Sequence, residues 1–252
     1  MLKYIKNKIR SILEIENIKH NQETIQRQLA ELKNMSEELL KAQIFNNAIV
    51  DSTWLKNKQF APSGWAMNYD SLYVLYNVLD KMKPQRILEF GLGQSSKIIY
   101  QYTAFFKDTF ALTYENDEEW VHYFKEGQTL GYDINIRISP VEYVACHGYD
   151  SLTYKNNCEE LKHEKFNLII VDGPHGSEHY SRPQILNIVP HCLSDNFCIL
   201  VHDSGRVGEN ETINELCNIL SINNIDFLTR KYEAKKAITL ITSPNNSFLL
   251  SI

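Results

Sequence analysis

The sequence lacks several features that mark specialised classes of protein. It has no run of roughly 18 apolar residues that could span a membrane. Its five cysteines are odd in number and include no C-x-x-C pair, so a disulfide framework and a zinc site are both disfavoured. We therefore expect reduced, mostly buried thiols, Cys158 among them, in a cytoplasmic protein.

An excess of positive charge is also missing. The formal net charge is −5, which gives no reason to expect nucleic acid as a partner. The N-terminus lacks the apolar core of a signal peptide, because Lys3, Lys6, Lys8 and Arg10 interrupt its apolar residues. The 252 residues suffice for one α/β domain of about 200 residues plus an extension.

Glycine and proline are absent from residues 1–46, which we assign to one long helix separate from a domain at 47–252. An apolar residue recurs there every seven positions, at Ile18, Ile25, Leu32 and Leu39. A second seam holds Ile15 and Leu29 but also the polar Gln22, Ser36 and Gln43. This imperfect heptad pattern predicts a coiled coil that makes a homo-oligomer, or else a helix lying on its own subunit.

The first ten residues alternate apolar and basic side chains and contain no acid. Such a stretch is either a solvated basic helix end or an amphipathic helix that contacts a membrane surface peripherally.

After residue 60, strand-like and helix-like segments alternate, which predicts a parallel sheet with helices on both faces. The expected fold is α/β, a Rossmann-like, doubly wound and mostly parallel sheet. A helix is predicted over Ser71–Met82. The parallel strands are expected at Arg86–Phe90, Phe110–Glu115, Ile134–Ile138, Phe166–Asp172 and Phe197–His202. An antiparallel edge pair is expected at Asp226–Arg230 and Ala237–Thr242.

Polar residues follow four of these strands at their carboxyl ends, where a doubly wound sheet binds its ligands. The four ends are Glu89 with its glycine turn, Tyr114-Glu115, Asp172–Gly176 and His202–Arg206. This convergence predicts one site. Glu115 is placed to accept hydrogen bonds from ribose hydroxyls.

The turn Glu89-x-Gly91-x-Gly93 is consistent with two kinds of cofactor. A dinucleotide usually needs a third glycine, and Ser96 stands in that position. Glu89 would also repel a pyrophosphate, whereas it suits a cofactor that carries an ammonium and a sulfonium group, as S-adenosylmethionine (SAM) does.

From about Ser63 to the C-terminus, this pattern resembles the class I SAM-dependent methyltransferases. Three further motifs resemble a branch that modifies sugars and surface polysaccharides, including the plant glucuronoxylan methyltransferases. They are Ser63-Gly64-Trp65, Val171-Asp172-Gly173-Pro174 and His202-Asp203-x-x-Arg206-x-x-Glu209. The resemblance implies an adenine pocket near Ser139–Glu142. It also implies that SAM contacts Ser63, Trp65, Glu89, Gly91, Gly93, Ser95, Ser96, Glu115 and Asp172.

Methyl transfer to a hydroxyl needs a group that takes the proton. Two mechanisms stay open: Asp172 or His175 acts as the base, or Asp172, His202 and Asp203 hold a divalent ion such as Mg²⁺. Asp203 and Arg206 complete the expected catalytic set. Arg182 and Arg206 are candidates to bind an acidic acceptor, and Arg206 could instead pair with Glu209. His179 and Tyr180 are placed on an acceptor-facing loop.

The sequence thus predicts a cytoplasmic SAM-dependent O-methyltransferase. Its acceptor would be a sugar, a nucleotide-sugar or a surface (capsular) polysaccharide precursor, with or without a phosphoryl group. Two alternatives are an NAD(P)-dependent oxidoreductase or epimerase, and a non-catalytic SAM-binding subunit of a partner enzyme.

Overall fold

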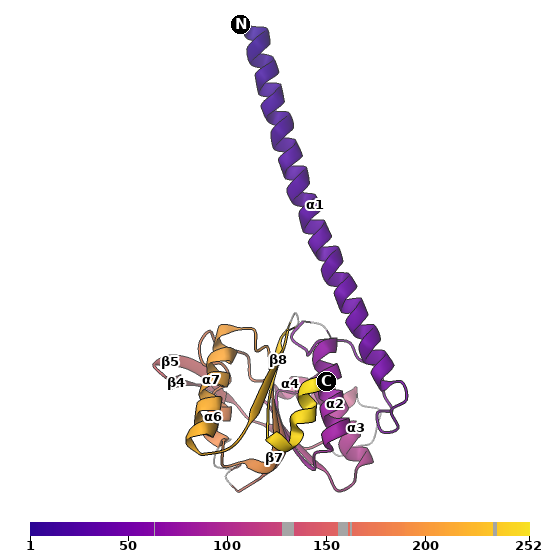
Figure 1. Ribbon diagram of the computed structural model, residues 1–252, viewed down its shortest axis with the longest axis vertical. Helices are drawn as coiled ribbons and strands as arrows, with labels where there is room; N and C mark the ends of the chain where they lie inside the picture. The colour runs from indigo at the N-terminus through magenta and orange to yellow at the C-terminus, as the bar shows by residue number, and fades with distance from the viewer. Residues whose placement is uncertain (63, 128–133, 156–160, 162, 234–235) are drawn as a thin grey trace. The chain divides into compact units, whose positions relative to one another are not determined.

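The computed structural model describes residues 1–62, 64–127, 134–155, 161, 163–233 and 236–252, with the backbone alone for residues 2–13 (Figure 1). Ser63, Cys158 and the basic side chains of the first ten residues therefore lie outside what is described. The chain divides into two compact units, Met1–Ile44 and Phe45–Ile252. Within the described residues, no helix combines the length and the apolar character that crossing a membrane requires.

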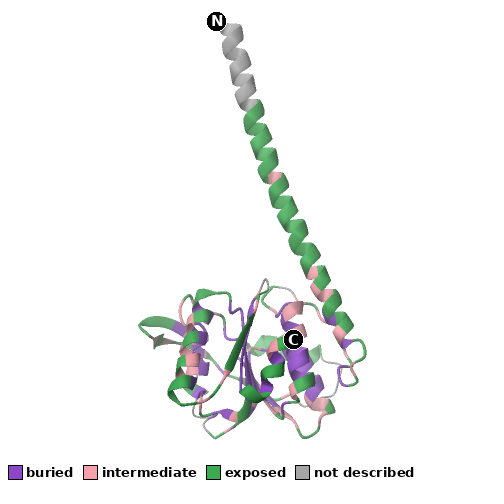
Figure 2. Cartoon of the chain, in the orientation of Figure 1, coloured by how far each residue is buried: buried purple, intermediate pink, exposed green. Residues whose placement is uncertain are grey.

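A single long helix, α1 (Leu2–Ile49), confirms the prediction from the absence of glycine and proline. Most of its described length is exposed, as the green colour in Figure 2 shows. Near its end the helix becomes buried: Phe45 and Ile49 lie in the core of the second unit.

The second unit is built on a seven-stranded sheet in the order β3-β2-β1-β6-β7-β9-β8. The first five of these strands are parallel, and β9 and β8 add an antiparallel pair at one edge. This arrangement confirms the predicted doubly wound fold with its antiparallel C-terminal pair. The strands are β1 (Arg86–Phe90), β2 (Phe110–Glu115), β3 (Ile136–Ile138), β6 (Phe166–Val171), β7 (Leu193–His202), β8 (Leu228–Tyr232) and β9 (Ile238–Thr242).

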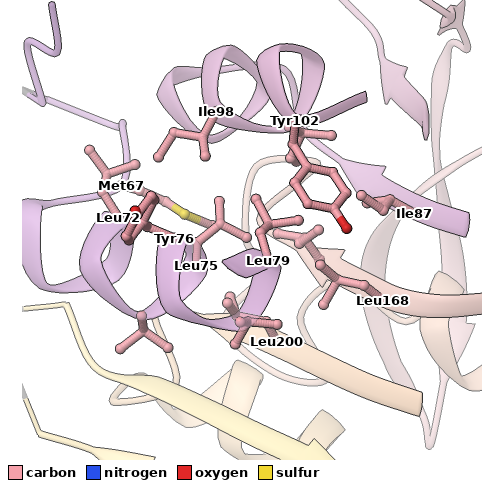
Figure 3. Close-up of a cluster of buried hydrophobic side chains, with 14 of the residues drawn as sticks. Met67, Leu72, Leu75, Tyr76, Leu79, Ile87, Ile98, Tyr102, Leu168 and Leu200 are labelled. Carbon is pink, nitrogen blue, oxygen red and sulfur yellow. The ribbon is translucent and has the colours of Figure 1, made fainter. Parts of the chain in front are cut away.

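Side chains alternate between the two faces of the sheet, and both faces are covered. On one face, Ile87 and Leu168 pack with Leu79 of α2 (Tyr69–Met82) and Ile98 of α3 (Gln94–Phe105), as Figure 3 shows. On the other face, strand residues such as Leu88 pack with α6 (Gln184–Ile188) and α7 (Val207–Ile222). Burial on both faces explains why the central strands read as continuous apolar runs.

Two elements were not predicted. A hairpin of β4 (Val141–Cys146) and β5 (Tyr149–Tyr154) forms a separate two-stranded sheet, and a 3₁₀ helix, η1 (Pro244–Ser251), follows β9. The hairpin turns at His147-Gly148, where both residues have positive φ, 50° and 87°. Two-residue turns with positive φ at both residues are the favoured connection in a hairpin, so the His-Gly pair could have indicated this hairpin in the sequence.

The chain builds β1, β2 and β3 outward in one direction and then returns to add β6 and β7 on the other side of β1. The strand order therefore reverses between β1 and β6. A crevice forms at such a reversal, beyond the carboxyl ends of the strands. Helix α4 (Glu118–Glu126) follows β2 at the same end of the sheet.

Candidate functional site

A cavity of about 450 Å³ lies at this reversal point and is lined by residues that follow β1, β2, β6 and β7. It is the site that the polar strand ends predicted. Of the predicted residues, those that line it are Trp65, Gly91, Gly93, Glu115, Asp172, His175, Arg182, Asp203 and Arg206.

The glycine turn forms one wall of the cavity. Gly91 has a φ of 98°, and a Cβ there would lie 3.0 Å from the backbone carbon of Asp172. A Cβ on Gly173 would lie 2.7 Å from Cα of Gly91. The loops after β1 and β6 thus touch backbone to backbone, which only glycine allows. Gly93 differs: a Cβ there would meet no described atom within 4 Å, so its backbone faces open space.

Glu89 is buried beneath this turn and is not among the residues that line the cavity. Its Oε2 accepts hydrogen bonds from Ser96 Oγ at 2.7 Å and from Thr113 Oγ1 at 2.8 Å. Its Oε1 is buried and has no hydrogen-bond partner among the described residues. Burial raises the pKa of Glu89 to about 7, against the opposing effect of the hydrogen bonds from Ser96 and Thr113.

Ser95 and Ser96 are buried under the turn as well. Ser96 Oγ accepts a hydrogen bond from Gly93 N at 2.9 Å while it donates to Glu89, so this hydroxyl holds the turn in shape. That both serines contact a cofactor stays a prediction. At the start of the helix, the residues that line the cavity are Gly93 and Gln94.

Glu115 ends β2 and faces the cavity. Its carboxylate accepts hydrogen bonds from the backbone N–H groups of Leu92 at 2.9 Å, Asn116 at 2.7 Å and Asp117 at 3.0 Å. A carboxylate offers about four acceptor sites, so room for a ligand hydroxyl remains. The three bonds fix the carboxylate in place beside the glycine turn.

Three titratable side chains, Asp172, His202 and Asp203, meet at the ends of β6 and β7 and form a second wall. Asp172 Oδ1 lies 2.7 Å from His202 Nδ1, and Asp203 Oδ2 lies 3.8 Å from the same nitrogen. The His202 side chain is fully buried, and its Nε2 has no partner among the described residues. Both Arg182 and Asp203 adopt positive φ, near 60°, a backbone strain that concentrates at functional sites.

Arg182 is the cation of this wall. The residue is 4% exposed, and its guanidinium donates to the backbone carbonyls of Pro174, Val171 and His202 at 3.0 to 3.3 Å. Its Nη2 lies 3.5 Å from Asp172 and 3.6 Å from Asp203. Burial alone would raise the pKa of Asp172, but the charges of His202 and Arg182 outweigh it and hold that pKa below its usual range.

A divalent ion was predicted at Asp172, His202 and Asp203, and the structure brings ligand atoms of all three within 4.8 Å of one another. Arg182, however, already gives both carboxylates a buried positive charge, and His202 Nδ1 is engaged by Asp172. A second cation would lie beside the guanidinium and be repelled by it. The group therefore fits a metal ion poorly.

Arg206 makes the pairing with Glu209 that the sequence left open as an alternative to binding an acceptor. Its guanidinium lies 3.1 Å from Asp203 and 3.7 Å from the buried Glu209, which also accepts a hydrogen bond from Ser181 Oγ at 2.9 Å. The side chain is nevertheless 46% exposed at the cavity, so its positive charge is also accessible to a ligand.

Trp65 and His175 form the rim on the side of the charged residues. Their rings meet edge to face at 4.8 Å, and Trp65 is 75% exposed. Lys236 Nζ donates to the backbone oxygens of Gly64 at 2.8 Å and Ala66 at 2.6 Å, which fixes the loop on both sides of Trp65.

Several predicted residues lie elsewhere. His179 bonds Glu211 at 3.0 Å, as does the backbone N–H of Tyr180, and neither residue lines the cavity. Arg182 does line the cavity, but it is almost fully buried rather than presented to an acceptor. Residues 139–142 lie outside the lining as well, with Ser139 Oγ donating to the carbonyl of Lys155.

Sequence reasoning missed two aromatic residues of the lining. Tyr154 ends the unpredicted hairpin. Trp120, in the first turn of α4, donates from Nε1 to the carbonyl of Leu92 at 2.8 Å. A signal for Trp120 existed: the helix after the second strand of such a sheet begins beside the ligand crevice.

Comparison with known proteins finds likenesses only among solved structures. No protein-family model and no curated protein matches the chain. A precorrin-6y C5,15-methyltransferase of Geobacter metallireducens is 9% identical, covering 74% of this chain and 94% of that one with a TM-score of 0.49. The O-methyltransferase TomG of Streptomyces achromogenes, in complex with SAM, is 12% identical over 82% and 89%, with a TM-score of 0.45.

A methyltransferase of Podospora anserina, bound to SAH (the demethylated product of SAM), is 16% identical over 81% of this chain and 86% of that one, with a TM-score of 0.45. At such identities and with TM-scores below 0.5, these likenesses do not decide what this chain does. The doubly wound α/β fold of this chain is established by its strand order, independently of these likenesses.

Proposed function

We propose that this chain is a SAM-dependent methyltransferase that acts on a hydroxyl group. One observation carries the proposal: the open backbone at Gly93, the N-terminus of α3 and the Glu115 carboxylate converge on one cavity. A helix N-terminus suits the carboxylate end of such a cofactor, and the remaining acceptor site of Glu115 suits its ribose. The residues present therefore fit SAM.

A dinucleotide fits this turn less well. The residue in the place of the third glycine, Ser96, is buried and holds both Gly93 and Glu89. Glu89 lies directly beneath the turn and becomes anionic as the pH rises through about 7. That charge would repel a pyrophosphate and attract a cofactor with positive groups.

When bound, SAM supplies an electrophilic methyl group on a sulfonium. His175 is the side chain placed to take the acceptor's proton, because its ring lines the cavity and makes no hydrogen bond within the described residues. Asp172 is the weaker candidate, since its pKa is lowered and His202 occupies its Oδ1.

For the acceptor, we infer a sugar that carries an acidic group, such as a nucleotide-sugar or a surface-polysaccharide precursor. Trp65 supports this, because an exposed indole on a fixed loop offers a flat apolar surface to a sugar ring. Arg206 supports it as well, because a half-exposed guanidinium at the same rim suits a phosphate or a uronate.

Binding is tested first, by titration calorimetry with SAM, its demethylated product SAH, and NADH. We expect heat with SAM and SAH alone. Glu115→Ala should weaken SAM binding at least about tenfold, as loss of a hydrogen bond to a charged group does. Glu118→Ala removes an exposed carboxylate nearby and serves as the control. Binding of NADH without SAM or SAH would overturn the proposal.

Turnover is tested by mass-spectrometric detection of methyl transfer across sugar and nucleotide-sugar acceptors, with and without a chelator. His175→Ala should keep SAM affinity and lose about 10²- to 10⁴-fold in rate, as loss of a general base does. His122→Ala, at an exposed histidine, should change neither. SAM binding with no transfer to any acceptor would favour the non-catalytic subunit instead.

A further inference from the structure

The exposed seam of α1 is the largest feature that the proposed function leaves unused. The apolar side chains on this seam are between 56% and 72% exposed, and they are Ile15, Ile18, Ile25, Leu29, Leu32 and Leu39. An isolated helix is marginal in water, because most helix stability in proteins comes from packing an apolar face. We therefore expect another helix to cover an exposed apolar seam of this length.

The spacing defines the geometry of that partner. With Ile15 at position a and Ile18 at position d of a heptad, the seam continues through Ile25, Leu32 and Leu39 at d. Of the remaining a positions, Leu29 is apolar, whereas Gln22, Ser36 and Gln43 are polar. A 3.5-residue period of this kind is typical of a helix that supercoils with other helices.

We propose that the seam binds α1 of a second copy of this chain, parallel and in register. In that arrangement, each g position lies beside the partner's e position five residues later. The chemistry of the two sides matches at every step. The pairs, with the partner's residue second, are Glu14 with Lys19, Asn21 with Gln26, Gln28 with Lys33, and Met35 with Leu40.

The polar a positions require the same alignment. Parallel and in register, Gln22 meets the partner's Gln22, and two side-chain amides can bond each other. In the antiparallel alignment that stacks the apolar layers, Gln22 would lie against the partner's Leu32. Lys19 would then lie opposite the partner's Lys33, and like charges repel. Polar residues at a positions commonly fix the register of a coiled coil in this way.

The outer positions of the helix argue against an anionic membrane as the occupant. The b and c positions that border the outer face carry five acids: Glu16, Glu23, Glu31, Glu37 and Glu38. An anionic lipid surface would repel these side chains. A second copy uses the seam and leaves the acids in water.

The mass of the full chain in solution, measured by light scattering over a range of concentrations, tests self-association. We expect a dimer or a trimer. Leu32→Asp, at a d position, should shift the chain to monomer. Asn34→Asp introduces the same side chain on the outer face and should leave the mass unchanged. A monomeric full chain, or an oligomer that Leu32→Asp does not dissociate, overturns the proposal.

Orientation is tested by charge exchange. Glu14→Lys and Lys19→Glu should each weaken self-association several-fold, because each places like charges at a g–e pair. Mixed together, the two variants should associate more tightly than either alone, since both pairs become attractive again. Pyrene on the N-terminal amine should give excimer emission, which requires adjacent N-termini. Oligomers with neither rescue nor excimer would overturn the parallel alignment.

Discussion

The two walls of the cavity are built in opposite ways. The glycine wall, Gly91–Gln94 with Glu115, presents backbone and one carboxylate that backbone N–H groups hold. The charged wall, Asp172–Arg182 with His202–Arg206, presents side chains whose charges balance one another around a buried guanidinium. One wall is open where a ligand would lie, and the other carries its own counter-ion. Under the proposed function, the first wall binds the cofactor and the second faces the acceptor.

The charged wall breaks most readily at Arg182. Arg182→Met removes the buried cation that Asp172 and Asp203 share. Among the described residues, the nearest partner left to Asp203 is then Arg206, and that left to Asp172 is His202. The variant should lose about 3 to 5 kcal/mol in free energy of unfolding, measured by denaturant titration. Arg182→Lys should cost less. Mn²⁺ should then stabilise the Met variant and not the natural chain, because the repelling guanidinium is gone. Equal stabilisation of both proteins by Mn²⁺ would show that the guanidinium does not exclude a metal.

The glycine wall is most sensitive to substitution where it contacts the loop after β6. Gly173→Ala places a Cβ 2.7 Å from Cα of Gly91 and 2.6 Å from the hydroxyl of Tyr154, so it should destabilise the fold by about 3 kcal/mol. Gly93→Ala meets no described atom within 4 Å. It should change stability by less than about 1 kcal/mol while it weakens SAM binding by filling the cavity. Similar unfolding curves for the two variants would contradict this distinction.

Glu89, beneath the glycine wall, should make the stability of the fold depend on pH. Its pKa in the fold is about 7 and its unfolded value is near 4.5, so between those pH values the folded state keeps a proton that the unfolded state has lost. Stability should therefore fall as the pH rises through this window, by up to about 2 to 3 kcal/mol. Urea titrations at pH 5 and pH 8 should show that Glu89→Gln removes most of this difference. Glu118→Gln should retain it.

The smallest effect on stability is expected at the rim. Trp65→Ala removes a side chain that is 75% exposed. The free energy of unfolding, measured by thermal unfolding, should therefore change by no more than about 0.5 kcal/mol. The KM for the sugar acceptor should rise about tenfold while SAM affinity stays the same. A loss of SAM affinity instead would assign Trp65 to the cofactor.

Much of the second unit could be predicted, because β1, β2, β6 and β7 are buried on both faces and end at polar residues. Residues that follow those strand ends line the cavity. The beginning of β7 at Leu193 was missed, since a polar stretch precedes Phe197. The hairpin of β4 and β5 was missed as well, since the side chains of β4 are exposed or half-buried and form no apolar run.

The place of Arg182 could not be predicted from its neighbours in sequence. The sequence suggested an arginine for an acidic acceptor. Its burial depends on a left-handed turn at residue 182 and on carbonyl groups from the ends of two strands and the loop between them. Only the closed fold brings these groups together, so no local pattern marks them.

The bond from Lys236 to the Trp65 loop has a consequence for biosynthesis. It joins residues 172 positions apart, and Lys236 lies between the last two strands of the sheet. A chain that emerges from the ribosome N-terminus first can therefore form the glycine wall well before this rim is fixed. The loop that carries Trp65 can receive this bond only once residue 236 has been synthesised, so this side of the cavity is fixed late in the synthesis of the chain.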